Sequence, residues 1–294
     1  MKWRGRRGSS NVEDRRGRSG RRIPLPRGRG ARAGGIGGLG AVAIVILGLI
    51  FGVDTSFLLG GGGGGFAPTQ QYEAGPNRID DETEEFVSVV LADTEEVWTA
   101  IFREQFGREY RAPKLVLFSG STRSACGAAS AATGPFYCPP ESRAYLDTSF
   151  FRTLSQDLGA GGDFAAAYVI AHEVAHHVQN ELGILPEVNE LRARAAERES
   201  NRLSVMVELQ ADCLSGVWAR EAQARFGSLE RGDIEEAMNA AARIGDDALQ
   251  RRSQGFVVPD SFTHGTSEQR VRWFESGFAS GDATACDTFS AERL

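Results

Sequence analysis

The sequence contains little histidine and little cysteine, four residues of each among 294. No two cysteines have the CxxC spacing of a structural zinc knuckle, so the cysteines do not predict that class of site. No internal repeat is visible, which argues against an architecture of stacked repeats. The chain is long and apolar enough to bury a sizeable core, so one globular domain with appendages is expected.

Charged residues are absent from residues 34–53, and this interval contains the apolar run AVAIVILGLIF at 41–51. Its length is just sufficient for one helix across a bilayer. Its glycines would weaken a helix in water but are tolerated in membrane helices, so residues 34–54 are interpreted as a signal anchor rather than a core helix. A cleaved signal peptide is the alternative, although the basic region before it is long and no convincing A-x-A site precedes the glycine run.

The charges are distributed unevenly around this segment. Residues 1–33 contain 12 Lys or Arg and two acids, which leaves 21 basic and 37 acidic residues in the rest of the chain. The positive-inside rule then places a basic arm, residues 1–33, in the cytoplasm and the remainder outside the cell membrane. The arm could contact anionic lipid. Nucleic-acid binding by its RGG-like segments is the rival interpretation, and no specific nucleic acid is expected.

The composition and periodicity after the anchor predict a linker and one domain. Residues 55–82 include the glycine run 60–65 and are expected to form a flexible linker before a domain at 83–294. Short β-prone runs lie between segments with helical spacing, so the predicted class is α+β. Helical spacing is expected at 84–106, where Asp93 and Thr94 form a possible cap between two helices. The other expected helices are 163–183, 187–225, 234–244 and 267–278. The expected strands are 114–118, 135–138 and 144–146.

The helix predicted at 163–183, with Asp163 as its cap, contains the sequence His-Glu-Val-Ala-His. His172 and His176 are four residues apart and therefore lie on one helix face, where both imidazoles can bind one Zn²⁺. Glu173 can bond the metal's water and act as the general base of peptide hydrolysis. Two surface histidines are the alternative, but small and apolar neighbours indicate a buried helix. His177 points to another side and is interpreted as structural.

A catalytic zinc usually has three protein ligands, so a third is expected elsewhere in the chain. Glu208 lies on the second long predicted helix, and Asp212 follows it by four residues on the same face. We assign Glu208 as the third ligand and Asp212 as the acceptor that holds a ligand histidine by its other ring N–H. The alternative is that both are surface acids of a charged helix.

Several segments together resemble a bacterial family of neutral zinc metallopeptidases. The matching segments are ACG at 125–127, GPFYCP at 134–139, AYLD at 144–147, HEVAHHVQ at 172–179, ELQADC at 208–213, GVWA at 216–219 and FTHGTSEQRVRWF at 262–274. The resemblance implies a basic N-terminal arm, one membrane span and a zincin-like domain. It also implies a gluzincin-type site formed by His172, His176 and Glu208.

The cysteines lie after the predicted anchor and would therefore meet an oxidising compartment. Of three possible pairings, Cys126 with Cys138 would close a short loop, which leaves Cys213 with Cys286. Reduced, buried thiols are the alternative.

His264 is the histidine outside the metal helix, and it precedes Arg270 in a segment that resembles the His-Pro-x-x-x-x-Arg segment of membrane gluzincins, with Gly265 in place of proline. A fourth protein ligand would close the position that water needs, so His264 is expected to donate to the oxyanion of the transition state. Capping of the helix that starts near Ser267 is the alternative. The sequence thus predicts a zinc peptidase acting on a protein or peptide; a zinc-binding but catalytically silent scaffold is the rival function.

Overall fold

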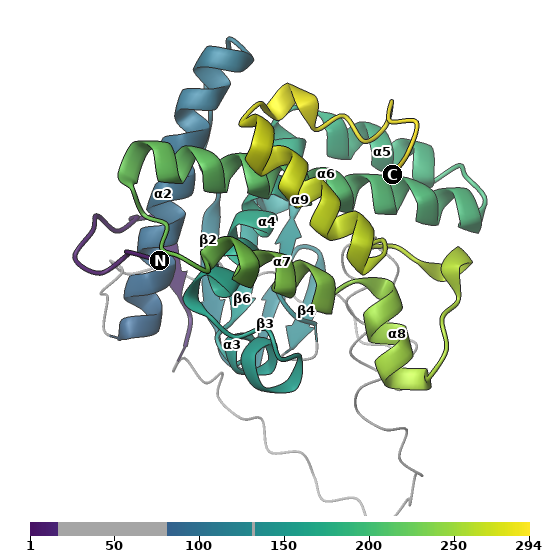
Figure 1. The fold of residues 1–294 in the computed structure, drawn as a ribbon, viewed down its shortest axis with the longest axis horizontal. Helices are drawn as coiled ribbons and strands as arrows, with labels where there is room; N and C mark the ends of the chain where they lie inside the picture. Colours follow the sequence, from purple (N-terminus) through teal and green to yellow (C-terminus); the bar gives the residue numbers. More distant parts are fainter. Residues whose placement is uncertain (17–80, 131–132) are drawn as a thin grey trace, which may run out of the picture.

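The computed structural model describes residues 1–16, 81–130 and 133–294. A small sheet packs against a layer of helices (Figure 1), which agrees with the predicted α+β class. The helices are α2 (Glu82–Gln105), α3 (Phe150–Arg152), α4 (Asp163–Glu181), α5 (Ile184–Arg192), α6 (Glu197–Phe226), α7 (Asp233–Arg243), α8 (Asp246–Gln254) and α9 (Ser267–Ser280). The strands are β1 (Val12–Asp14), β2 (Lys114–Phe118), β3 (Ser121–Ser124), β4 (Gly127–Ser130), β5 (Phe136–Cys138) and β6 (Arg143–Asp147).

The main sheet has the strand order β1-β2-β6-β5, in which β5 alone runs antiparallel to its neighbour. Side chains of β2 alternate between two cores, because successive residues of a strand point to opposite faces. Leu115 and Leu117 join the large core formed with the helices. Val116 and Phe118 join a smaller core with Phe136, and this core also takes in Ala129 of the separate β3–β4 hairpin. The strand is therefore covered on both faces.

Helix α4 lies at the centre of the helical layer and contacts α2, α6, α7 and the sheet. All of its residues from Phe164 to Gln179 are buried. Helices α6 and α9 approach each other closely at two glycines. A Cβ added at Gly216 would lie 2.1 Å from the carbonyl oxygen of Phe274, and one added at Gly277 would lie 1.8 Å from that of Cys213. These contacts leave no room for a methyl group between α6 and α9.

Most predicted elements are present, with differences at helix boundaries. The segment 84–106 forms one helix, α2, and Asp93 and Thr94 lie inside it rather than between two helices. The helix expected at 187–225 is divided into α5 and α6 by a break at 193–196. Helix α8 and the β3–β4 hairpin were not predicted. Asp163 is the first residue of α4, and Gly162 occupies the cap position.

Residues 1–16 differ most from the expected organisation, in which residues 1–33 form an arm apart from the domain. They pack on the domain, and β1 pairs with β2 in parallel. Among the described residues, no helix combines the length and apolar character that a membrane crossing needs. The predicted anchor at 34–54 and nearly all of the linker at 55–82 lie outside the described residues, so the membrane crossing stays a prediction.

The α6–α9 contact predicts a stability effect. Gly277→Ala should lower the free energy of unfolding by about 3 kcal/mol, because the methyl group would overlap backbone of α6 and force the helices apart. Gly161→Ala is the control, since its Cβ would meet only Ser155 Cβ at 3.7 Å. Thermal unfolding of both purified variants measures the difference, and equal midpoints would contradict the close packing.

Candidate metal centre

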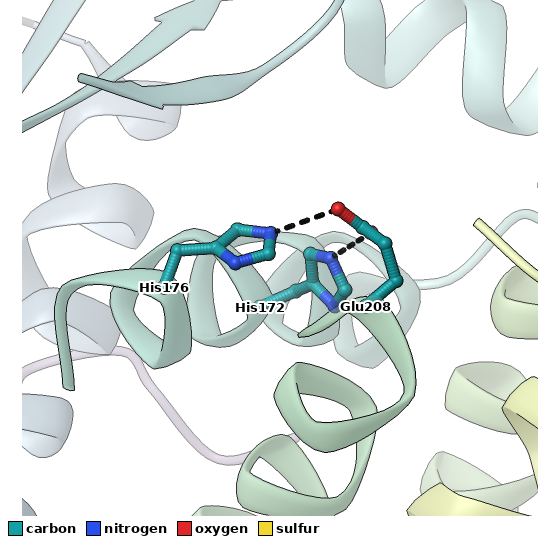
Figure 2. Close-up of side chains that lie close together, drawn as sticks. All are labelled: His172, His176 and Glu208. Atoms are coloured by element: carbon teal, nitrogen blue, oxygen red, sulfur yellow. Dashed lines mark hydrogen bonds and ion pairs between the residues drawn. The ribbon is translucent and has the colours of Figure 1, made fainter. Parts of the chain in front are cut away.

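Helices α4 and α6 bring two histidines and a carboxylate together. His172 Nε2 lies 3.1 Å from Glu208 Oε2, and His176 Nε2 lies 3.4 Å from Glu208 Oε1. Figure 2 shows both imidazole rings directed toward the Glu208 carboxylate from adjacent turns of α4. One ligand atom from each of the three side chains lies within 4.8 Å of the other two. The structure therefore brings together the three residues that the sequence predicted as metal ligands.

The donor set fits a zinc ion. Ligand atoms about 2.0–2.1 Å from a tetrahedral Zn²⁺ are separated by about 3.3 Å, which agrees with the two histidine–carboxylate distances. Glu208 Oε1 and Glu173 Oε2 are buried and accept no hydrogen bond from any described residue. Buried carboxylate oxygens without a partner are costly, and a cation at this position would satisfy Glu208. Two imidazoles and a carboxylate also form a common ligand set of catalytic zinc.

The other ring nitrogen of His172 faces a buried charge network. Its Nδ1 lies 3.0 Å from Asp212 Oδ1, the residue predicted to hold this ring, although the angles between the two groups are not those of a hydrogen bond. Arg270 of α9 donates to Asp212 through Nε at 2.8 Å and Nη2 at 3.0 Å, and the Tyr168 hydroxyl also donates to Asp212. Burial lowers the pKa of His172, but the carboxylates of Asp212 and Glu208 outweigh burial and raise this pKa to about 9. Asp212 therefore faces the Nδ1 proton of His172, and a metal bound at Nε2 would take the place of the second proton of the ring.

His176 is oriented by an amide instead. Its Nδ1–H donates to Gln179 Oε1 at 2.9 Å, which leaves Nε2 free for a metal. The Gln179 amide nitrogen donates to Val207 O and to Gln210 Oε1 of α6. Burial lowers the pKa of His176 to about 4, although the charge of Glu208 opposes this shift. His176 is therefore neutral near pH 7, the form that binds a metal.

Glu173 lies beside the two histidines and is 9% exposed. Burial raises its pKa to about 7, and the negative charge of Glu208 adds to the effect, whereas the charge of His172 opposes it. A carboxyl group with a pKa near neutrality can both accept and return a proton. The position and the raised pKa of Glu173 suit the role of general base.

His264 lies on the loop before α9 and close enough to the centre for its charge to lower the pKa of Glu208. Its Nδ1 lies 3.2 Å from Asp246 Oδ1, and Asp246 Oδ2 accepts backbone N–H groups of Thr263, His264 and Gly265. Burial lowers the pKa of His264, but the charges of Glu208 and Asp246 raise it overall. Thr266, rather than His264, caps α9. Asp246 thus fixes both the loop and the ring of His264.

His177 and the cysteines have structural roles in this region. His177 contacts the Tyr137 hydroxyl of β5 and the Arg111 carbonyl, as expected for a residue that does not face the metal site. Both predicted disulfides are present. Cys126 is bonded to Cys138, and Cys213, which directly follows Asp212, is bonded to Cys286.

Four residues that support the site were not predicted for these roles: Tyr168, Gln179, Asp246 and Arg270. The role of Gln179 could have been predicted, because it lies three residues after His176 and therefore on a neighbouring face of the same helix. Arg270 appeared in the sequence only through its spacing from His264. Tyr168 lies four residues before His172 on the same face of α4, whereas Asp246 had no such spacing, since its partner is 18 residues away.

The contact between Asp212 and His172 predicts a metal-affinity effect. Asp212→Asn should weaken zinc binding by about 10–100-fold, because an amide lacks the negative charge that supports the basicity of His172, and its NH₂ group cannot accept from Arg270. Competition with a chelating dye measures the affinity. Asp246→Asn is a matched control, a buried aspartate beside His264 whose loss should leave zinc affinity within about threefold. Equal affinities in the two variants would remove Asp212 from this role.

Comparison with known proteins agrees with the metal centre. The family described as "putative neutral zinc metallopeptidase" matches residues 1–289. The chain is 51% identical to the uncharacterized protein YpfJ of Escherichia coli strain K12, over 98% of this chain and 99% of that protein. It is 45% identical to the uncharacterized protein Rv2575 of Mycobacterium tuberculosis, over 63% of this chain and 65% of that protein. No solved structure matches the chain significantly. The chain belongs to the neutral zinc metallopeptidase family.

Proposed function

We propose that the protein is a zinc-dependent peptidase of the gluzincin type, in which Glu173 is the general base. The observation that carries this proposal is the convergence of His172, His176 and Glu208 within 4.8 Å, beside the buried carboxyl of Glu173. His172 Nε2, His176 Nε2 and the Glu208 carboxylate would hold the metal. The substrate class is a protein or peptide, because these ligands and this base suit amide hydrolysis by water.

The chain's own groups supply proton transfer. When bound, zinc would lower the pKa of its water toward neutrality and polarise the scissile carbonyl. Glu173 accepts the proton of the attacking water on its carboxylate and delivers that proton to the nitrogen of the leaving amine. Asp212 and Gln179 keep the two imidazoles in position during these steps.

His264 is proposed to stabilise the negative charge that develops on the carbonyl oxygen. Its Nδ1 faces Asp246, so its Nε2 can donate a hydrogen bond only when the ring is protonated. The charges of Glu208 and Asp246 favour this protonated form. A donor placed in advance beside the reacting carbonyl stabilises the transition state more than the ground state.

A catalytically silent zinc scaffold is the rival function, and Glu173 argues against it. The buried Glu173 Oε2 has no hydrogen-bond partner among the described residues. A structural metal site gains nothing from such a carboxyl, whereas a peptidase needs an unpaired oxygen to receive a proton.

Glu173→Gln tests the proposed base. The variant should retain one zinc per chain and the wild-type fold, but hydrolysis of denatured casein should fall at least about 100-fold, because an amide cannot accept the water's proton. Zinc content is measured by elemental analysis and turnover by released peptides. Glu190→Gln on α5 is the control and should remain active. Activity of Glu173→Gln near that of the control would exclude the proposed role.

His264→Ala tests the proposed oxyanion donor. Turnover should fall by about 100-fold, the scale seen when one oxyanion donor is removed, while the chain still folds and its zinc content stays near wild type. Loss of zinc would identify His264 as a ligand instead. Normal turnover with normal zinc would assign it a purely structural role.

A further inference from the structure

Residues 1–16 form an integral part of the folded domain. Strand β1 extends the sheet, with Val12 opposite Leu115 and Asp14 opposite Leu117. The Leu115 N–H donates to Asn11 O at 2.9 Å, and the Arg15 N–H donates to Leu117 O at 2.8 Å. Further along the segment, the Ser9 N–H donates to Ser88 O of α2 at 2.9 Å. These are backbone contacts of the kind that hold a sheet together.

Apolar side chains of the segment enter the main core. Trp3 is 4% exposed, and its ring packs edge-on against Phe86 with the centroids 5.5 Å apart. Val12 is 3% exposed and contacts the same core. Exposure of a tryptophan and the surface that it covers would be costly, so the segment and the domain stabilise each other.

Charged contacts fix the register of the segment on α2. Arg6 donates to both carboxylate oxygens of Asp93 at 2.6 and 2.7 Å, and its guanidinium lies over the Phe226 ring. Asp93 is 4% exposed in the middle of α2, where an ionised carboxylate needs a cationic partner. Arg6 supplies that partner from a position 87 residues away in the chain.

Residues 16 and 81, which flank the interval outside the described residues, lie side by side. Arg16 Nη1 donates to Asp81 Oδ2 at 2.6 Å, and Arg16 Nη2 donates to Glu84 Oε2 at 3.1 Å. Asp81 caps α2, the helix on which residues 6–9 also pack. The chain therefore leaves the domain and returns to it at one place.

We propose that residues 1–16 and residues 81–294 occupy the same aqueous compartment, on one side of any membrane. A single crossing would separate β1 from β2 and Arg6 from Asp93. If residues 1–16 of one chain packed on the domain of a second copy, the two would still have to lie on the same side of a membrane. The inference differs from the single crossing predicted from the charge distribution, and it does not depend on peptidase activity.

Cysteine labelling of the full chain in cells tests the compartment. All four natural cysteines are in disulfides, so Ser10→Cys and Ser253→Cys each add one exposed thiol on the two sides of the interval. A membrane-impermeant maleimide is applied before and after permeabilisation, with the unsubstituted chain as background. We expect both positions to label in intact cells, or both only after permeabilisation. Labelling of one position alone in intact cells overturns the proposal.

Charge exchange tests whether the segment docks. In the full chain, Arg6→Glu and Asp93→Arg should each lower the melting temperature by about 5 °C or more, and the double variant should recover at least half of the loss. Arg7→Glu is the control, because Arg7 is 63% exposed and lies 3.9 Å from Glu96. If the single variants have the same melting temperature as the control, residues 1–16 do not dock. That result would overturn the proposal, whether or not the protein is an active peptidase.

Discussion

The pairing of buried carboxylates on α6 with buried histidines on α4 is the constraint on which this structure depends. Glu208 is 1% exposed and Asp212 is fully buried, so neither charge is solvated by bulk water. Each carboxylate must therefore meet a cation or a donor within the protein. His172 lies between the two, and this position fixes the register of α4 against α6. Arg270 completes the network from α9. Gly216 of α6 and Gly277 of α9 let the two helices approach closely, as this contact needs.

The centre could be predicted from the sequence where its chemistry depends on spacing along one helix. The four-residue intervals between His172 and His176 and between Glu208 and Asp212 place each pair on one helix face. The spacing did not show the contact of Arg270 with Asp212 or that of Asp246 with His264, because the two partners of each pair lie on different elements. Those contacts exist only after the helices have packed. Their sequence neighbourhoods are ordinary for a helix or its first turn.

The differences between the predicted and the observed elements have a similar origin. The break at 193–196 lies in a run of Ala and Arg that contains neither glycine nor proline, so local propensity favours a continuous helix there. Asp93 and Thr94 suggested a cap, but Arg6 neutralises Asp93 inside a continuous helix. The residues of β1, Val-Glu-Asp, have no strand pattern of their own. They form a strand because β2 offers an open edge, which is a non-local contact.

The complete burial of α4 from Phe164 to Gln179 limits how this protein could be re-engineered. A helix on a protein surface offers half of its positions for variation, whereas here each of these side chains fills space in the core or contacts the metal centre. Five alanines in this interval allow neighbouring elements to come close: Ala165, Ala166, Ala167, Ala171 and Ala175. A library of variants directed at α4 would therefore lose most of its members to misfolding, and the loops around the centre are the productive targets.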